Sequence, residues 1–148
     1  MIAGAGCGVF ADRPSLCRHW YCGWRIMAVG DALRPDRSGV LLAPETGGQP
    51  GYARGGLRVV LIGRDRAALR NAELIDLIAR CVMRRAPIWL SWGDGAAAKR
   101  YLVNGDLTDA LEAADQRAFH AALDAALEGL IADVEGTGAT AQDRARPA

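Results

Sequence analysis

The sequence predicts a small, three-layer-like α/β (or α+β) domain with a central parallel βαβ unit, an N-terminal edge hairpin and a long C-terminal helix. Residues 57–62 form an almost unbroken apolar, β-branched run, typical of a strand buried on both faces. Apolar residues recur at helical spacing over 74–82, and a second apolar run spans 88–92. Together these segments fill the roughly 30 residues of a βαβ crossover, which makes the two strands parallel.

The residues before this unit predict an irregular lead-in and then the edge hairpin. Residues 1–23 mix glycine, proline and cysteine without periodicity. Short apolar runs at 24–29 and 40–43, separated by turn-forming residues at 34–39, predict the two strands of a loose hairpin. Residues 44–56 hold five glycines and two prolines, so we expect a loop there.

The crossover helix has recognisable ends. Asn71 is a suitable N-cap, because its side chain can accept a hydrogen bond from the first helical turn. Arg84 and Arg85 suit the negative end of the helix dipole, and Pro87 stops the helix. Cys81 lies on the apolar face of this helix and is expected to belong to the core.

The C-terminal third predicts mainly helix. Residues 96–103 read as a short helix with Asp94 as its N-cap, ended by the Asn104-Gly105 pair. A long alanine- and leucine-rich pattern then runs to Val134. One continuous helix over 107–134 would be about 42 Å long, which exceeds what a short sheet can cover. Either the helix is broken, near Asp115, or part of it projects and packs on something else.

One domain is expected in 148 residues. The predicted division is an irregular lead-in at 1–23, a single α/β domain at 24–135 and a disordered tail at 136–148. An alternative start at Met27 would leave residues 1–26 outside the native protein.

The net charge is close to neutral at +1, which argues against a nucleic-acid-binding protein. The charge is nevertheless unevenly distributed. Residues 54–100 carry ten Lys and Arg against four acidic residues, whereas residues 101–135 carry one Arg against eight acidic residues. The simplest interpretation is that the acidic helix docks on the basic βαβ unit; the alternative is that it meets a basic partner. The dominance of arginine over lysine indicates GC-rich codon usage, as in many bacterial proteins.

No stretch approaches the roughly 20 apolar residues of a membrane-spanning helix. The N-terminus also lacks the basic region and apolar run of a secretory signal. We therefore expect a cytoplasmic protein that does not act in a membrane.

The best candidate ligand site is the carboxyl edge of the two parallel strands, where open α/β sheets bind ligands. Backbone N–H groups and basic side chains there would attract a phosphate or carboxylate. Asp65 and Asp94 could supply acid, base or metal chemistry. Glycine and aspartate also occur in such loops simply because tight turns and helix caps require them. The candidate residues are Gly63, Arg64, Asp65, Arg66, Trp92, Gly93, Asp94, Gly95 and Lys99.

A second candidate site is metal-binding. Cys7, Cys17, His19 and Cys22 supply four zinc-capable side chains, but their spacing lacks the paired cysteine knuckles of structural zinc sites. Ordinary thiols in a reducing cytoplasm are the alternative. Zinc is the one cofactor that the sequence suggests.

Familiar catalytic motifs are missing, and only His19 and His120 could serve a nucleophilic triad. The sequence thus favours a non-catalytic binding or regulatory protein that acts on a protein partner or a second copy through the acidic C-terminal helix and the aromatic cluster. One alternative is a small enzyme or sensor for a phosphorylated or nucleotide-like anion. The other is a zinc-stabilised adaptor. The aromatic cluster comprises His19, Trp20, Tyr21, Trp24, Trp89 and Trp92.

Overall fold

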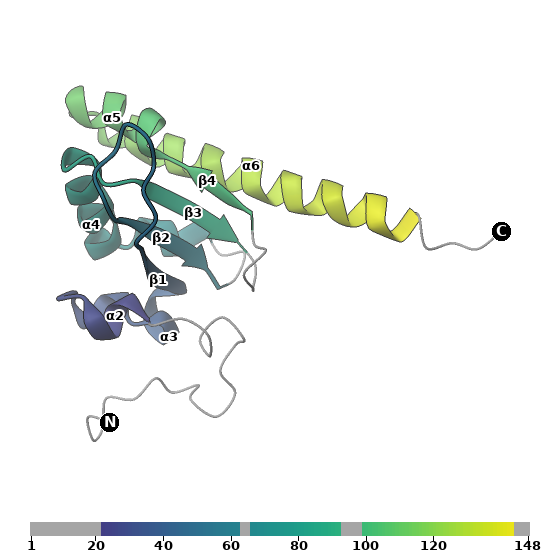
Figure 1. Ribbon diagram of the computed structural model, residues 1–148, viewed down its shortest axis with the longest axis horizontal. Coiled ribbons are helices and arrows are strands. Elements are labelled where there is room, and N and C mark those ends of the chain that lie inside the picture. The colour runs from purple at the N-terminus through teal and green to yellow at the C-terminus, as the bar shows by residue number, and fades with distance from the viewer. Residues whose placement is uncertain (1–21, 63–65, 93–98, 144–148) are drawn as a thin grey trace, which may run out of the picture.

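A four-stranded mixed sheet lies at the centre of the protein, for which the computed structural model describes residues 22–62, 66–92 and 99–143 (Figure 1). The strand order is β1-β2-β3-β4, with β2 and β3 parallel and both outer pairs antiparallel. The fold class is therefore α/β, as predicted. The strands are β1 (Val40–Glu45), β2 (Gly56–Leu61), β3 (Ile88–Trp92) and β4 (Arg100–Leu102).

The predicted βαβ unit is present as β2, α4 (Ala72–Met83) and β3. A 3-10 helix, η2 (Arg66–Arg70), precedes α4. Asn71 caps α4 as expected, since its Oδ1 accepts a hydrogen bond from the Leu74 N–H at 3.2 Å. The apolar stripe of α4 is buried against the sheet and consists of Leu74, Leu77, Ile78 and Val82.

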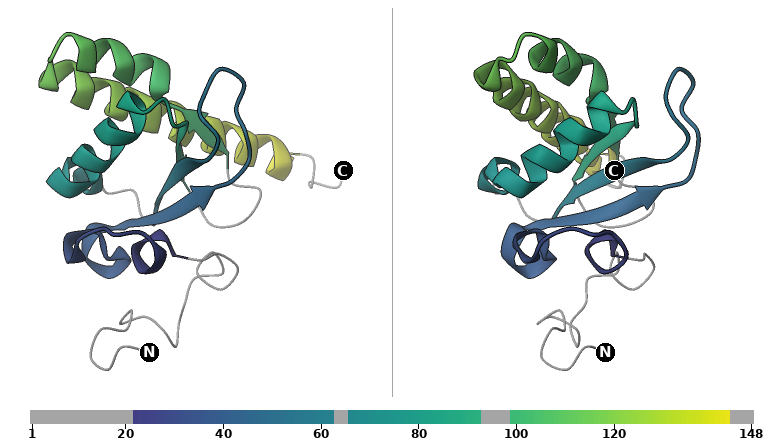
Figure 2. Two further views of the ribbon diagram at one scale, coloured as in Figure 1. Left: turned by 60° about the vertical axis from the view of Figure 1, so that its left-hand side comes forward. Right: turned by 90° about the vertical axis from the view of Figure 1, so that its left-hand side faces the viewer.

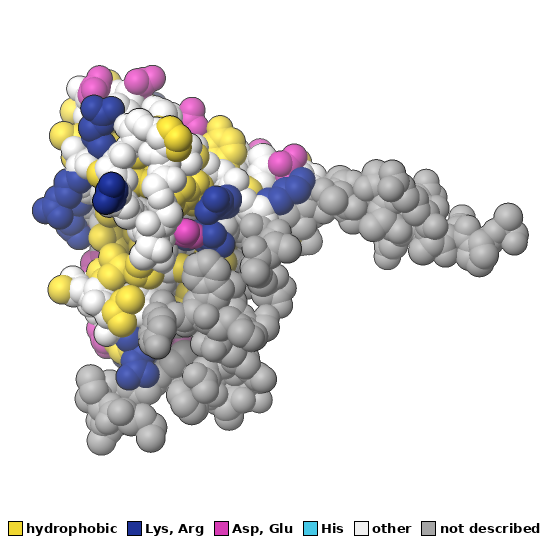
Figure 3. Space-filling view, in the orientation of Figure 1, with side chains coloured by type: hydrophobic (Ala, Val, Ile, Leu, Met, Phe, Trp, Pro, Cys, Tyr) yellow, Lys and Arg dark blue, Asp and Glu magenta, His cyan; other side chains and the backbone are white. Residues whose placement is uncertain are grey.

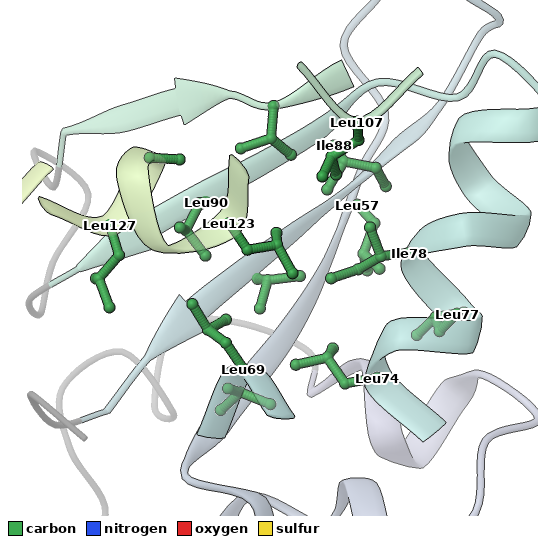
Figure 4. Close-up of a cluster of buried hydrophobic side chains, with 14 of the residues drawn as sticks. Leu57, Leu69, Leu74, Leu77, Ile78, Ile88, Leu90, Leu107, Leu123 and Leu127 are labelled. Carbon is green, nitrogen blue, oxygen red and sulfur yellow. The ribbon is translucent and has the colours of Figure 1, made fainter. Parts of the chain in front are cut away.

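The main core lies between the sheet and the helices on one of its faces (Figure 4). Leu57, Ile88 and Leu90 project from the central strands into this core, where they meet side chains from α4 and α6. Leu123 and Leu127 from α6 are completely buried there. Removing this apolar area from water, at about 25 cal/mol per Å², stabilises the contact between helices and sheet.

Two further helices, α5 (Asn104–Glu112) and α6 (Gln116–Asp143), lie side by side after β4 (Figures 1 and 2). The helical pattern is broken near Asp115, which is one of the two alternatives that the sequence left open. Ala114 adopts a left-handed φ of 52° in the turn, and Asp115 Oδ1 accepts a hydrogen bond from the Ala118 N–H at 2.9 Å. Helix α6 continues to Asp143, beyond the predicted end at Val134, and its last turns project past the sheet (Figure 1).

The edge hairpin differs from the prediction. Residues 24–29 do not form a strand, because α2 (Gly23–Ile26) occupies part of this segment. Trp24 and Met27, three residues apart, both pack against the core, which a helical turn permits and an alternating strand does not. The hairpin at the sheet edge is formed by β1 and β2 instead, joined by residues 46–55.

Short helices flank β1 at this edge of the sheet (Figure 2): α2, η1 (Asp31–Leu33) and α3 (Pro35–Ser38). Gly23 is required in α2, because a Cβ there would lie 2.8 Å from the Leu42 carbonyl oxygen. Covering β1 in this way limits its exposure as an unpaired sheet edge.

The helix predicted at 96–103 is also wrong for its described part, because Arg100–Leu102 forms β4. These residues pair with the free edge of β3, so that sheet hydrogen bonding overrides the weak helical pattern. The Asn104-Gly105 pair lies at an element boundary, as expected, but it begins α5 instead of ending a helix.

Asn104 explains why α5 starts where it does. Its side chain is buried, and Oδ1 accepts a hydrogen bond from the Ile88 N–H at 2.7 Å while Nδ2 donates to the Ala86 carbonyl at 2.8 Å. One side chain therefore satisfies two backbone groups at the start of β3 and ties α5 to the sheet.

We expect Asn104→Ala to lower the free energy of unfolding by about 1–3 kcal/mol, because a buried N–H and a part-buried carbonyl of the backbone lose their partner. Urea unfolding followed by circular dichroism measures this change. Gln116→Ala, an exposed amide at the start of α6, is the matched control. Equal effects for the two variants would contradict the bridging role of Asn104.

Candidate functional site

An open groove of about 620 Å³ lies between β4, α5 and α6. Three polar side chains stand on its β4 and α5 side, and small residues of α6 line the rest. The lining residues are Tyr101, Asp106, Asp109, Ala121, Ala122, Ala125, Ala126 and Gly129.

The helix α6 makes this groove possible by presenting small residues at positions four apart. Ala121 and Ala125 are exposed, whereas Ala126 is buried against the core. A Cβ added at Gly129 would meet nothing within 4 Å, so the groove is open at that end. Another chain could therefore approach the α6 backbone closely along this surface.

The acidic wall of the groove is built on the first turns of α5. Asp106 and Asp109, three residues apart, are both exposed. The Tyr101 hydroxyl donates a hydrogen bond to Asp106 Oδ2 at 3.3 Å. The Asp106 carboxylate raises the pKa of Tyr101, because a tyrosinate would lie beside a negative charge.

Acidic side chains of α6 that do not line the groove are neutralised by the chain itself. Arg66 in η2 pairs with Glu128 at 2.7 Å, and Arg70 pairs with Asp124. Arg70 Nη1 also donates to His120 Nδ1 at 2.9 Å.

A third contact of this kind joins Lys99 to α6. Its Nζ donates to the Asp133 carbonyl at 3.1 Å and lies 3.8 Å from the Asp133 carboxylate. Part of the acidic segment, residues 101–135, therefore docks on the basic region, residues 54–100, of the same chain.

Asp106, Asp109 and Glu112 have no ion-pair partner within the described ranges of the chain. Figure 3 shows acidic side chains along the upper rim, over α5 and the start of α6, and a group of basic side chains beside α4. The charge asymmetry of the sequence is therefore only partly balanced internally. The unbalanced negative charge borders the groove.

The sequence-predicted crevice is described only in part. Arg66 and Lys99 each have a carboxylate partner on α6, and Trp92 is half-buried against the main core. The remaining residues of that prediction lie outside the described residues: Gly63, Arg64, Asp65, Gly93, Asp94 and Gly95.

The predicted zinc ligands Cys7, Cys17 and His19 also lie outside the described residues. Cys22 is half-buried and packs against Leu41 and Val60. Within residues 22–62, 66–92 and 99–133, no three His, Cys, Asp or Glu side chains gather closely enough to hold a metal ion.

The described members of the aromatic cluster pack against the body of the protein. Trp89 is 6% exposed, with the Arg100 guanidinium 5.0 Å from its ring centroid, while Trp24 and Trp92 are half-buried on the core. Beside Trp89, Arg58 pairs with Glu45 at 2.5 Å. These contacts indicate a structural role for these residues.

No protein-family model, curated protein or solved structure matches the chain. None of the described helices combines the length and apolarity needed to cross a bilayer.

The groove residues were not among the site residues predicted from the sequence. The signal in the sequence is the coincidence of acidic residues three apart at 106 and 109 with small residues recurring through 121–129. These two patterns become one surface only because the chain reverses at Ala114.

We expect Asp106→Asn to lower the pKa of Tyr101 toward that of a free tyrosine, since the neighbouring negative charge is removed. Tyrosinate absorbance during an alkaline titration reports this shift. Asp109→Asn, which removes the neighbouring groove carboxylate, is the comparison. An unchanged titration in Asp106→Asn would rule out the contact.

A double-mutant cycle on Arg70 and Asp124 should give a coupling free energy of at most about 1 kcal/mol at low salt, because both side chains are partly exposed. Molar salt should reduce it by screening. The cycle on the more exposed Arg37–Asp31 pair is the control and should couple more weakly. Urea unfolding of the wild type and the six variants tests this order.

Proposed function

We propose that this protein is a non-catalytic binding module that takes up a basic segment of a protein partner in the groove between β4, α5 and α6. The supporting observation is the pair of carboxylates, Asp106 and Asp109, which border an open, small-residue groove and have no ion-pair partner in the described part of the chain. A positively charged partner would supply the cations that pair with these two carboxylates.

The shape of the groove favours a polypeptide. Small residues along about two turns of α6 allow another chain to lie close to the helix, in the way that amphipathic helices enter grooves. Tyr101 adds an amphipathic ring that can cover apolar surface while its hydroxyl keeps the contact with Asp106. Such aromatic side chains are common in protein interfaces.

The chemistry of the groove favours binding over catalysis. Its polar groups are two exposed carboxylates and a tyrosine whose pKa is raised, so the tyrosine stays protonated at neutral pH and cannot act as a base. As part of this proposal, the protein acts in the cytoplasm, as expected from the sequence.

Anion binding at the carboxyl edge of the parallel strands receives less support. Arg66 and Lys99, the described cations of that site, both contact carboxylates of α6. An incoming phosphate would have to displace these contacts.

The proposed function predicts that a fluorescein-labelled amphipathic helix of leucine and lysine binds the protein, with an affinity that falls as salt rises. Fluorescence anisotropy measures the dissociation constant. Asp106→Asn/Asp109→Asn should weaken binding about tenfold or more through the lost charge pairs. Ala125→Phe should weaken it by filling the groove without changing the charge.

Glu73→Gln/Asp76→Asn is the matched control, because it removes the same charge from an exposed face of α4. A leucine and glutamate peptide controls for apolar binding alone. If the control and groove variants bind the basic peptide equally, the groove is not the binding site.

A further inference from the structure

The groove is complementary to a surface that combines a long apolar side chain with neighbouring cations. Its α6 side is lined by alanine and glycine, so a long apolar side chain has to come from the partner. Asp106 and Asp109 stand on one wall, so cations are needed beside that side chain. The complement of the groove is therefore a protruding apolar residue flanked by two basic residues.

The chain carries this combination at the end of α4. Met83 is 71% exposed, more than any other large apolar side chain in the described residues. Arg80 lies one helical turn before Met83 and Arg84 follows it directly, and both are exposed. We name Arg80, Met83 and Arg84 the basic knob.

The knob is free to make an external contact. Neither Arg80 nor Arg84 has a carboxylate partner in the portion of the chain that the structure describes. The opposite face of α4 is used for the core, so Met83 contributes to surface instead of to folding. Methionine is unbranched and flexible, which suits insertion into a shallow apolar groove.

We propose that the partner taken up by the groove is a second copy of this chain, whose basic knob inserts Met83 beside Tyr101 and places Arg80 and Arg84 against Asp106 and Asp109. This inference rests on the proposed function, because it uses the same groove. It identifies the partner by chemistry present in the chain itself.

The contact joins two molecules, because Met83 is exposed and does not line the groove of its own chain. α4 and α5 pack against each other, which puts knob and acidic wall on neighbouring helices (Figures 1 and 2). A two-fold axis between copies can therefore use both surfaces twice, each knob entering the other copy's groove. The assembly is a closed dimer.

Charge reversal tests this arrangement with full-length protein. Arg80→Glu/Arg84→Glu puts acidic residues on the knob, and Asp106→Arg/Asp109→Arg puts basic residues in the groove. Each variant alone should be monomeric in sedimentation velocity, because its knob and groove carry like charges. An equimolar mixture should dimerise, since both knob-to-groove contacts are then complementary.

The mixture also controls for misfolding, because two unfolded variants would not restore a dimer. Met83→Ser should weaken the wild-type dimer about tenfold, since the apolar anchor is lost. Arg25→Glu/Arg54→Glu carries the same charge change on other exposed arginines and should leave dimerisation unchanged.

Several outcomes would overturn the inference: a wild-type monomer at every concentration, a dimer that persists in both reversal variants, or a mixture that stays monomeric while the wild type dimerises. The proposed function fails separately. The proposed function is wrong if the basic peptide binds the groove variants as tightly as the wild type. If the wild type is a monomer and the peptide still binds in its groove, the proposed function is supported and only the dimer is ruled out.

Discussion

The parallel pairing of β2 and β3 forces the chain to cross one face of the sheet between these strands. Helix α4 makes that crossing and buries its apolar stripe, which defines the face where the main core forms. Helix α6 then covers the remaining apolar surface of the same face through Leu123 and Leu127. Because α5 precedes α6 and packs against it, the groove is a by-product of how this one face is covered.

The acidic side chains of α6 and its small residues lie on different parts of the helix surface. Asp124 and Glu128 meet arginines of η2, so negative charge there helps to orient the helix on its own domain. On the groove side, small residues replace charged ones, and the carboxylates come from α5. The acidic segment therefore attaches α6 to its own domain through some carboxylates, and the proposed function assigns recognition to others.

The central unit of the fold was predictable because its signals are local and strong. The apolar runs of β2 and β3, the periodicity of α4 and the Asn71 cap each act within a few residues. Segments whose structure depends on distant partners were not predictable in the same way. Arg100–Leu102 is a strand only because the edge of β3 is available.

The candidate site shows the same limit. Residues 63–66 and 93–95 can be recognised in the sequence as loops after parallel strands, because they contain the glycine and aspartate typical of such loops. The groove combines Tyr101 from β4 with α5 and α6 residues, and each is unremarkable within its own segment. Only the left-handed turn at Ala114 brings the two helical patterns together.

That turn sets the geometry of the groove separately from the core. Residues 113–115 join the two helices that form the walls of the groove, yet they lie outside the strands and the buried stripe of α4. Glycine at Ala114 would keep the turn, because it adopts a φ of 52° without steric cost. An insertion or deletion in residues 113–115 would alter the width and tilt of the groove while the apolar core kept its sequence. Under the proposed function, partner choice would then change through this three-residue connection without any change in the core.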